Sequence, residues 1–271
     1  MINCFSHMIK GEEEKYLEAA KEAVFKAGEE ILLVLGDEGR QIDYKGELDL
    51  VTEMDRYSET LIRELLTRRF PHIAVLAEEG GVFGDDSGAR WIIDPIDGTT
   101  SYAHGLPHFA LSIGLEVEGV VRAGVVYNPP LKECFTAIKG RGAYLNGREI
   151  GVSKTSELKR SLLATGFPYD RKSNDNNNLD KFGAFLMKIQ GIRRMGSAAL
   201  DLCYTAAGRF DGYWEMRLKP WDTAAGFLIL MEAGGVITDF SGNEYSIYSD
   251  ELLASNGRIH NQMLSVLKEL E

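Results

Sequence analysis

Residues 91–100 of this 271-residue chain read Trp91-Ile92-Ile93-Asp94-Pro95-Ile96-Asp97-Gly98-Thr99-Thr100. The apolar run predicts a strand that ends at Asp94, and Pro95 then fixes a turn. A second carboxylate, Asp97, follows in that turn. Gly98 allows a close backbone bend, and the hydroxyls after it are placed to open a helix. Two carboxylates beside a row of backbone N–H groups can present a divalent cation and a phosphate to each other.

Asp-Pro-x-Asp-Gly is also ordinary turn chemistry, so the motif in isolation does not distinguish a site from a simple connection. Three further acidic residues lie in matching settings. Glu78 ends a predicted strand over residues 73–77, so it and Asp94 are expected at the same edge of a sheet. Asp222 follows a Pro-Trp turn at the start of a helix, and Asp49 lies in the loop before another helix. Taken singly, these are a helix cap, a solvated strand end and loop polarity. Taken as a set, they predict a metal-dependent phosphatase.

Composition limits the class of protein. A formal net charge of −11 disfavours nucleic-acid binding, which needs a basic surface. An acidic protein that handles phosphate esters needs cations between the ester and its own carboxylates. No run approaches the roughly 20 apolar residues of a membrane span. The first residues lack the pattern of a secretory signal, and the three cysteines have no ligand spacing. We therefore expect a cytoplasmic protein with reduced thiols that binds no membrane.

Periodicity predicts helices over residues 12–35 and 52–69, the second opening with a capping-box-like Thr52 and Asp55. Residues 110–117 and 120–127 flank Glu118-Gly119, which is a hairpin signal. From residue 152 onward, short strands alternate with helices.

This pattern predicts three segments within a single globular unit. Residues 1–11 form a flexible extension. Residues 12–151 form an α+β subdomain with an antiparallel sheet and most of the metal ligands, and residues 152–271 form an α/β subdomain that completes the active site.

The chain resembles the inositol monophosphatase family along nearly its whole length, from about residue 12. The two signatures of that family are matched by residues 91–100 and by Pro220-Trp221-Asp222-Thr223-Ala224-Ala225-Gly226 followed by Glu232-Ala233-Gly234-Gly235. Shorter similarities lie at Asp49-Leu50-Val51-Thr52 with Asp55, at Ala77-Glu78-Glu79, and at Arg194-Met195-Gly196-Ser197-Ala198-Ala199-Leu200-Asp201-Leu202. The chain departs from the family at Gly80-Gly81, where Ser or Thr is frequent.

The resemblance implies a layered α-β-α-β-α sandwich of the α/β (α+β) class, like that of inositol monophosphatases and fructose-1,6-bisphosphatases. It implies two or three Mg²⁺ ions per active site. Glu78, Asp94 and the backbone carbonyl of Ile96 would hold one ion. Asp94, Asp97 and Asp222 would hold a second, and Glu78 would share a weaker third. Carboxylate and carbonyl oxygens are the ligands that Mg²⁺ prefers.

The same resemblance assigns roles around the metal ions. Thr99, paired with Asp49, would orient and help deprotonate the attacking water, and the Gly98 and Thr99 amides would hold the phosphate. The residues expected on the substrate side are Gly196, Ser197, Ala198, Glu215 and Asp222. Glu215 would accept hydrogen bonds from an inositol hydroxyl, a contact that suits any polyol.

We therefore predict an Mg²⁺-dependent phosphomonoesterase that hydrolyses inositol 1-phosphate. The resemblance also implies inhibition by Li⁺ and assembly as a homodimer. Fructose 1,6-bisphosphate, other sugar phosphates and NADP(H) are alternative substrates within the superfamily. A different class also stays open, since some bacterial members are regulatory partners of the transcription machinery.

Overall fold

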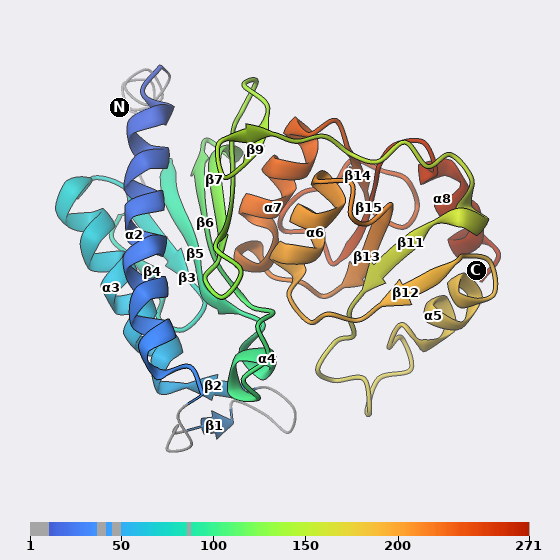
Figure 1. The fold of residues 1–271 in the computed structure, drawn as a ribbon, viewed down its shortest axis with the longest axis horizontal. Helices are drawn as coiled ribbons and strands as arrows, with labels where there is room; N and C mark the ends of the chain where they lie inside the picture. The colour runs from blue at the N-terminus through green and yellow to red at the C-terminus, as the bar shows by residue number, and fades with distance from the viewer. Residues whose placement is uncertain (1–10, 37–41, 45–49, 86–87, 271) are drawn as a thin grey trace.

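The computed structural model describes residues 11–36, 42–44, 50–85 and 88–270. Its elements form five layers in the order helix, sheet, helix, sheet, helix (Figure 1). The layered α-β-α-β-α sandwich expected from the sequence is confirmed. Among the described residues, no helix is both long enough and apolar enough to cross a membrane.

The helices are α2 (Glu13–Val34), α3 (Glu53–Arg69), α4 (Thr99–Ala103), α5 (Leu179–Leu186), α6 (Ala198–Ala206), α7 (Pro220–Glu232) and α8 (His260–Lys268), with a short 3₁₀ turn at Leu158–Arg160. The strands of the first half are β1 (Ile42–Tyr44), β2 (Leu50–Thr52), β3 (Ala74–Ala77), β4 (Gly81–Phe83), β5 (Ala89–Asp97), β6 (Ala110–Val117), β7 (Val120–Asn128), β8 (Glu133–Ile138), β9 (Ala143–Leu145) and β10 (Arg148–Glu149). Those of the second half are β11 (Leu162–Thr165), β12 (Gly191–Arg193), β13 (Gly212–Met216), β14 (Val236–Thr238) and β15 (Glu251–Ser255).

The outer helices α2 and α3 cover one face of the first sheet with the apolar stripes that the sequence predicts. The capping box that opens α3 is also confirmed. The Thr52 hydroxyl accepts from the backbone N–H of Asp55 at 3.4 Å, and the Thr52 N–H donates to the Asp55 carboxylate at 2.8 Å. This fixes the start of α3 beside the carboxyl end of β5.

The first sheet has the order β10-β9-β8-β7-β6-β5-β3-β4 and is antiparallel except for the β3–β5 pair. Because β3 and β5 are parallel, their carboxyl ends meet at one edge, as predicted for Glu78 and Asp94. The hairpin prediction is confirmed as well. Glu118 (φ 52°) and Gly119 (φ 75°) form the two-residue turn between β6 and β7.

The predicted end of the central strand at Asp94 is wrong, because β5 continues to Asp97. Asp94 pairs with Ser112, and Asp97 pairs with Ala110, so β5 holds one residue more than β6 in this interval. Pro95 has no N–H to donate to a ladder, and such a bulge is where a strand tolerates it. The bulge displaces the two carboxylates from simple strand alternation.

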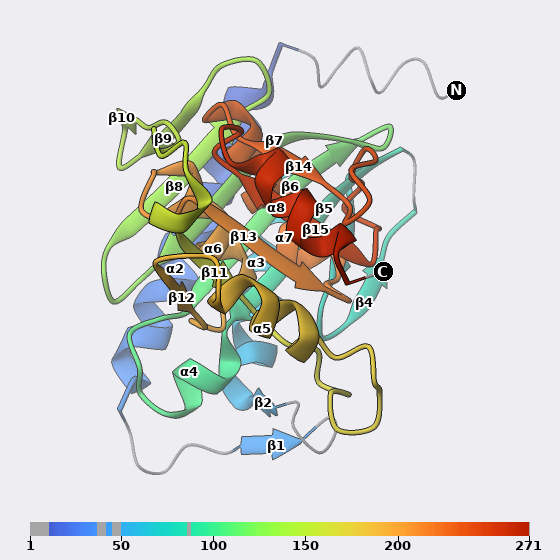
Figure 2. The same ribbon diagram turned by 90° about the vertical axis from the view of Figure 1, so that its right-hand side faces the viewer.

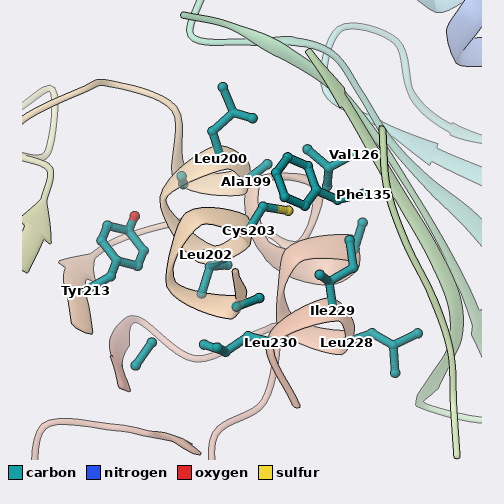
Figure 3. Packing of buried hydrophobic residues seen from close by; sticks show 14 of the residues in the cluster. Val126, Phe135, Ala199, Leu200, Leu202, Cys203, Tyr213, Leu228, Ile229 and Leu230 are labelled. Atoms are coloured by element: carbon teal, nitrogen blue, oxygen red, sulfur yellow. The ribbon is translucent and has the colours of Figure 1, made fainter. Parts of the chain in front are cut away.

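Helices α6 and α7 lie between the two sheets and form the central core. Figure 3 shows Cys203 of α6 directed toward Val126 and Phe135 of the first sheet, beside Leu228 and Ile229 of α7. The side chain of Cys203 is fully buried, and burial raises the pKa of its thiol well above the ordinary value. This thiol is therefore part of the packing.

The second sheet has the order β12-β11-β13-β15-β14, in which β12, β11 and β13 are parallel and β15 is antiparallel to its neighbours. Helices α5 and α8 cover its outer face (Figure 2). The rings of Phe185 and Trp214 pack there with centroids 4.3 Å apart. The first sheet ends at Glu149 and the second begins at Leu162.

Candidate active site

A cavity of about 440 Å³ opens where the carboxyl ends of β3 and β5 meet α4, the end of β13 and the start of α7. The predicted site residues that line it are Glu78, Asp94, Ile96, Asp97, Gly98, Thr99, Glu215 and Asp222. A smaller pocket of about 100 Å³ shares part of this lining and adds Gly196 and Ala198. Asp49, predicted as the partner of Thr99, lies outside the described residues.

Burial and mutual repulsion dominate the electrostatics of the acidic residues. Burial, followed by the charges of Glu78, Asp97 and Asp222, raises the pKa of Asp94 well above its ordinary value. Burial raises the pKa of Asp97 to about 6, against the hydrogen bonds it accepts. Burial and the charge of Asp97 raise the pKa of Asp222 well above its ordinary value. These carboxylates interact strongly enough that a cation between them would be stabilising.

Hydrogen bonds hold one oxygen of each of three carboxylates. Asp94 Oδ1 accepts from the Ile96 N–H at 3.0 Å, and Asp222 Oδ2 accepts from the Lys219 N–H at 2.6 Å. Asp97 Oδ2 accepts from the Ser197 hydroxyl at 2.6 Å and from the N–H of Ala199 at 2.7 Å. Ser197, predicted on the substrate side, is buried and bonded to Asp97.

The donor set suits Mg²⁺. Within the described ranges, no three Asp, Glu, His or Cys side chains already surround one point at coordinating distance. Mg²⁺ does not need such a cluster, because it usually takes one or two carboxylates and completes its octahedron with waters and substrate phosphate oxygens. Glu78, Asp94, Asp97 and Asp222 share one cavity and supply hard oxygen donors there.

Gly98 makes the bend between β5 and α4 possible. Its φ of 97° is left-handed, and a Cβ atom would lie 3.1 Å from the carbonyl oxygens of both Gly196 and His108. Only glycine allows this close approach. The bend brings Asp97 and Thr99, on either side of it, into the lining of the same cavity.

Thr99 contacts Asp55, which the sequence predicts to be part of a helix cap and of the early family motif. The Thr99 hydroxyl lies 3.1 Å from Asp55 Oδ1 and 3.0 Å from the carbonyl oxygen of Ile96. Asp55 is fully buried, and burial raises its pKa to about 6, against hydrogen bonds from Thr52. The sequence signal that could have identified Asp55 is its place in the same early motif as Asp49.

Glu215 lines the cavity at the end of β13. The Tyr213 hydroxyl donates to Glu215 Oε2 at 2.5 Å, and burial raises the pKa of Glu215 to about 7. The carboxylate lies against Gly166, where a Cβ atom would approach it to 2.0 Å. Glu215 therefore depends on a glycine at residue 166 for its position.

Comparisons with known proteins agree with this geometry. The model of the inositol monophosphatase family matches residues 12–271. The chain is 46% identical over 256 residues to an inositol-1-monophosphatase of Synechocystis sp., covering 94% of this chain and 89% of that protein. It is 42% identical over 255 residues to the Nus factor SuhB of Vibrio cholerae, covering 93% and 96%. The solved inositol monophosphatase of Anabaena (Nostoc) sp. superposes with a TM-score of 0.87 at 42% identity, covering 95% of this chain and 97% of that one. The chain belongs to the inositol monophosphatase family.

Proposed function

We propose that this protein is an Mg²⁺-dependent phosphomonoesterase that hydrolyses inositol 1-phosphate by in-line attack of water on the phosphorus. One observation carries the proposal: Glu78, Asp94, Asp97 and Asp222 line one cavity together with the Thr99 hydroxyl and the Glu215 carboxylate. The high sequence identity to inositol-1-monophosphatases supports the choice of substrate.

Four side chains and one carbonyl would hold the metal ions. Glu78, Asp94 and the Ile96 carbonyl oxygen form one donor group, and Asp94, Asp97 and Asp222 form the other, with Asp94 shared. Bound Mg²⁺ would supply charge neutralisation for the attacking and leaving oxygens. Burial and mutual repulsion raise the pKa of Asp94 and Asp222, and bound cations would replace that repulsion by attraction.

The residues beside the metal ligands position the phosphate and the water. The N–H groups of Gly98 and Thr99 lie where the chain leaves β5, which suits them to phosphate oxygens. The Thr99 hydroxyl, 3.1 Å from Asp55 Oδ1, would orient the attacking water and accept its proton while passing its own proton to the Asp55 carboxylate. The family resemblance implies that Asp49 also pairs with Thr99 and helps to deprotonate the water, and we keep that assignment as part of the proposal.

The substrate wall recognises hydroxyl groups. Glu215 accepts hydrogen bonds from the ring hydroxyls of inositol, and its bond from Tyr213 fixes its orientation. Gly196 and Ala198 present a small surface on the same side, which leaves room for the inositol ring. Ser197 acts on the substrate only through Asp97.

The test is phosphate release from inositol 1-phosphate and from fructose 1,6-bisphosphate in MgCl₂, with and without LiCl. We expect a clear preference for inositol 1-phosphate and inhibition by Li⁺. Equal or faster release from the bisphosphate would make the protein a broad sugar phosphatase, with NADP(H) as the next substrate to assay. A wild-type protein silent on all of these esters would overturn the proposal.

A second candidate function is regulatory binding to the transcription machinery, because the chain is 42% identical to a protein named Nus factor SuhB. The variant Asp97→Asn separates the two roles. A pull-down of RNA polymerase that survives this substitution, while phosphatase activity is lost, would establish a second role. We further propose a cytoplasmic homodimer that makes no direct contact with nucleic acid, consistent with the net charge of −11.

A further inference from the structure

The loop over residues 166–178 forms one wall of the catalytic cavity. Phe167, Pro168, Tyr169 and Asp170 face the cavity from this loop, opposite residues 215–219 at the end of β13. The contacts that hold this loop in place therefore set the shape of the catalytic cavity.

A buried asparagine ties the two ends of this loop together. The Asn178 side-chain amide donates to the Gly166 carbonyl at 2.7 Å and to the Thr165 hydroxyl at 2.9 Å. Its oxygen accepts from the Trp214 indole N–H at 2.8 Å. Asn178 is fully buried, so these bonds are shielded from water and the loop ends are firmly fixed.

The middle of the loop is held by an exposed ion pair. Arg217 Nη1 contacts both carboxylate oxygens of Asp170, and Nη2 donates to the Asn176 carbonyl at 3.2 Å. The side chains are 28% and 48% exposed, so the pair is worth at most about 1 kcal/mol and can be removed without unfolding the protein. Arg217 has a left-handed φ of 62°, and its N–H donates to the Asp250 carbonyl at 2.5 Å.

A second cavity of about 470 Å³ lies on the other side of Arg217. Met216 and Arg217 line both cavities, so their side chains form the partition between them. The remaining wall of the second cavity carries Asn176, Ser249 and the carboxylates of Asp239, Asp250 and Glu251. The three carboxylates of this lining outnumber its one cation, Arg217, so the cavity suits a neutral group that bears N–H and O–H donors and disfavours a second phosphate.

We propose that the Arg217–Asp170 ion pair determines substrate size by separating the two cavities. With the pair intact, the wall favours a phosphate ester with a small leaving group such as a polyol. With the pair broken, the leaving group can extend into the second cavity, and a nucleoside has the neutral, donor-rich chemistry that this cavity fits. The inference rests on the proposed phosphatase activity.

The test compares kcat/KM for adenosine 2′-monophosphate with kcat/KM for inositol 1-phosphate in the wild-type protein and in the variants Arg217→Ala and Asp170→Ala. We expect the ratio to rise by up to about fivefold in both variants, which is the factor that a pair worth about 1 kcal/mol can contribute. The two variants change the charge of the wall in opposite directions but break the same pair. A control, Arg141→Ala, breaks a more exposed ion pair with Glu14 that lines neither cavity, and its ratio should match the wild type.

Ratios that move in opposite directions in the two variants would show a charge effect and overturn the partition. Unchanged ratios with normal hydrolysis of inositol 1-phosphate would overturn the partition and leave the proposed function intact. If the wild-type protein hydrolyses neither ester, the proposed function fails. Calorimetric affinity for adenosine 2′-monophosphate then decides the partition, with tighter binding in both variants as the supporting result.

Discussion

Asp97 Oδ2 accepts a 2.6 Å hydrogen bond from the hydroxyl of Ser197, a residue 100 positions further along the chain. Asp97 is the last residue of β5 in the first sheet, and Ser197 caps α6 between the two sheets. The bond thus fixes a proposed metal ligand against the second half of the molecule. Such supporting bonds orient a ligand before the metal binds.

Ser197→Ala removes the donor that orients Asp97. We expect the Mg²⁺ concentration for half-maximal activity to rise roughly tenfold, with kcat at saturating Mg²⁺ changed less. Ser265→Ala is the matched control, because its exposed hydroxyl bonds to the Asn261 carbonyl in α8, outside the lining of the cavity. Equal Mg²⁺ dependence in the wild type and Ser197→Ala would show that this bond has no part in metal binding.

Asp97→Asn tests the metal ligand itself. We expect turnover to fall roughly 100-fold or more, because a neutral amide is a poor Mg²⁺ ligand. The fold should persist, and in EDTA at pH 8 the variant should melt at a higher temperature than the wild type. The reason is that burial disfavours the charged form of Asp97, as its pKa of about 6 indicates. Near-normal activity would remove Asp97 from the site.

The metal-free protein should lose stability as the pH rises. Asp55 and Asp97 have pKa values of about 6 in the folded chain, above the ordinary value of 3.8. The folded state therefore binds more protons than the unfolded state between these values, and the free energy of unfolding falls as the pH rises from about 4 through about 6. Urea midpoints in EDTA at pH 5 and pH 8 measure this fall. Saturating Mg²⁺ should reduce it, and a rising midpoint would contradict the sign.

Thr99→Val keeps the shape of the side chain but removes its hydroxyl. We expect kcat to fall roughly 100-fold with little change in melting temperature, because the hydroxyl is proposed to position the attacking water. Thr67→Val is the control, since its hydroxyl bonds to the Arg63 carbonyl within α3. Thr99→Ser should recover most of the activity, whereas an inactive serine variant would argue that the hydroxyl is not what matters.

Gly166→Ala tests whether the position of the Glu215 side chain matters for substrate binding. An added Cβ would meet the Glu215 carboxylate at 2.0 Å, so the carboxylate must move. We expect KM for inositol 1-phosphate to rise roughly tenfold, with a smaller effect on kcat, as for a lost contact to a bound hydroxyl. Gly183→Ala in α5 is the control, because its Cβ would meet nothing within 4 Å and should stabilise the helix by up to about 1 kcal/mol. An unchanged KM in Gly166→Ala would separate Glu215 from substrate binding.

The sequence by itself determined the elements whose signals are local. Apolar periodicity placed α2 and α3, the Thr52–Asp55 pair marked the start of α3, and Glu118-Gly119 marked a hairpin. The acidic residues now found around one cavity were also recognisable, because each follows a strand or opens a helix within a few residues of a turn signal. Such features depend on neighbours along the chain.

Only the tertiary structure decided how distant residues meet. The strand β5 runs past Asp94 because its register with β6 admits a bulge, which no local pattern specifies. The contact of Thr99 with Asp55 spans 44 positions, and the dependence of Glu215 on Gly166 joins the ends of two strands. These contacts are set by sheet register and by the packing of helices between the sheets. A sequence pattern limited to one turn or strand therefore cannot predict them.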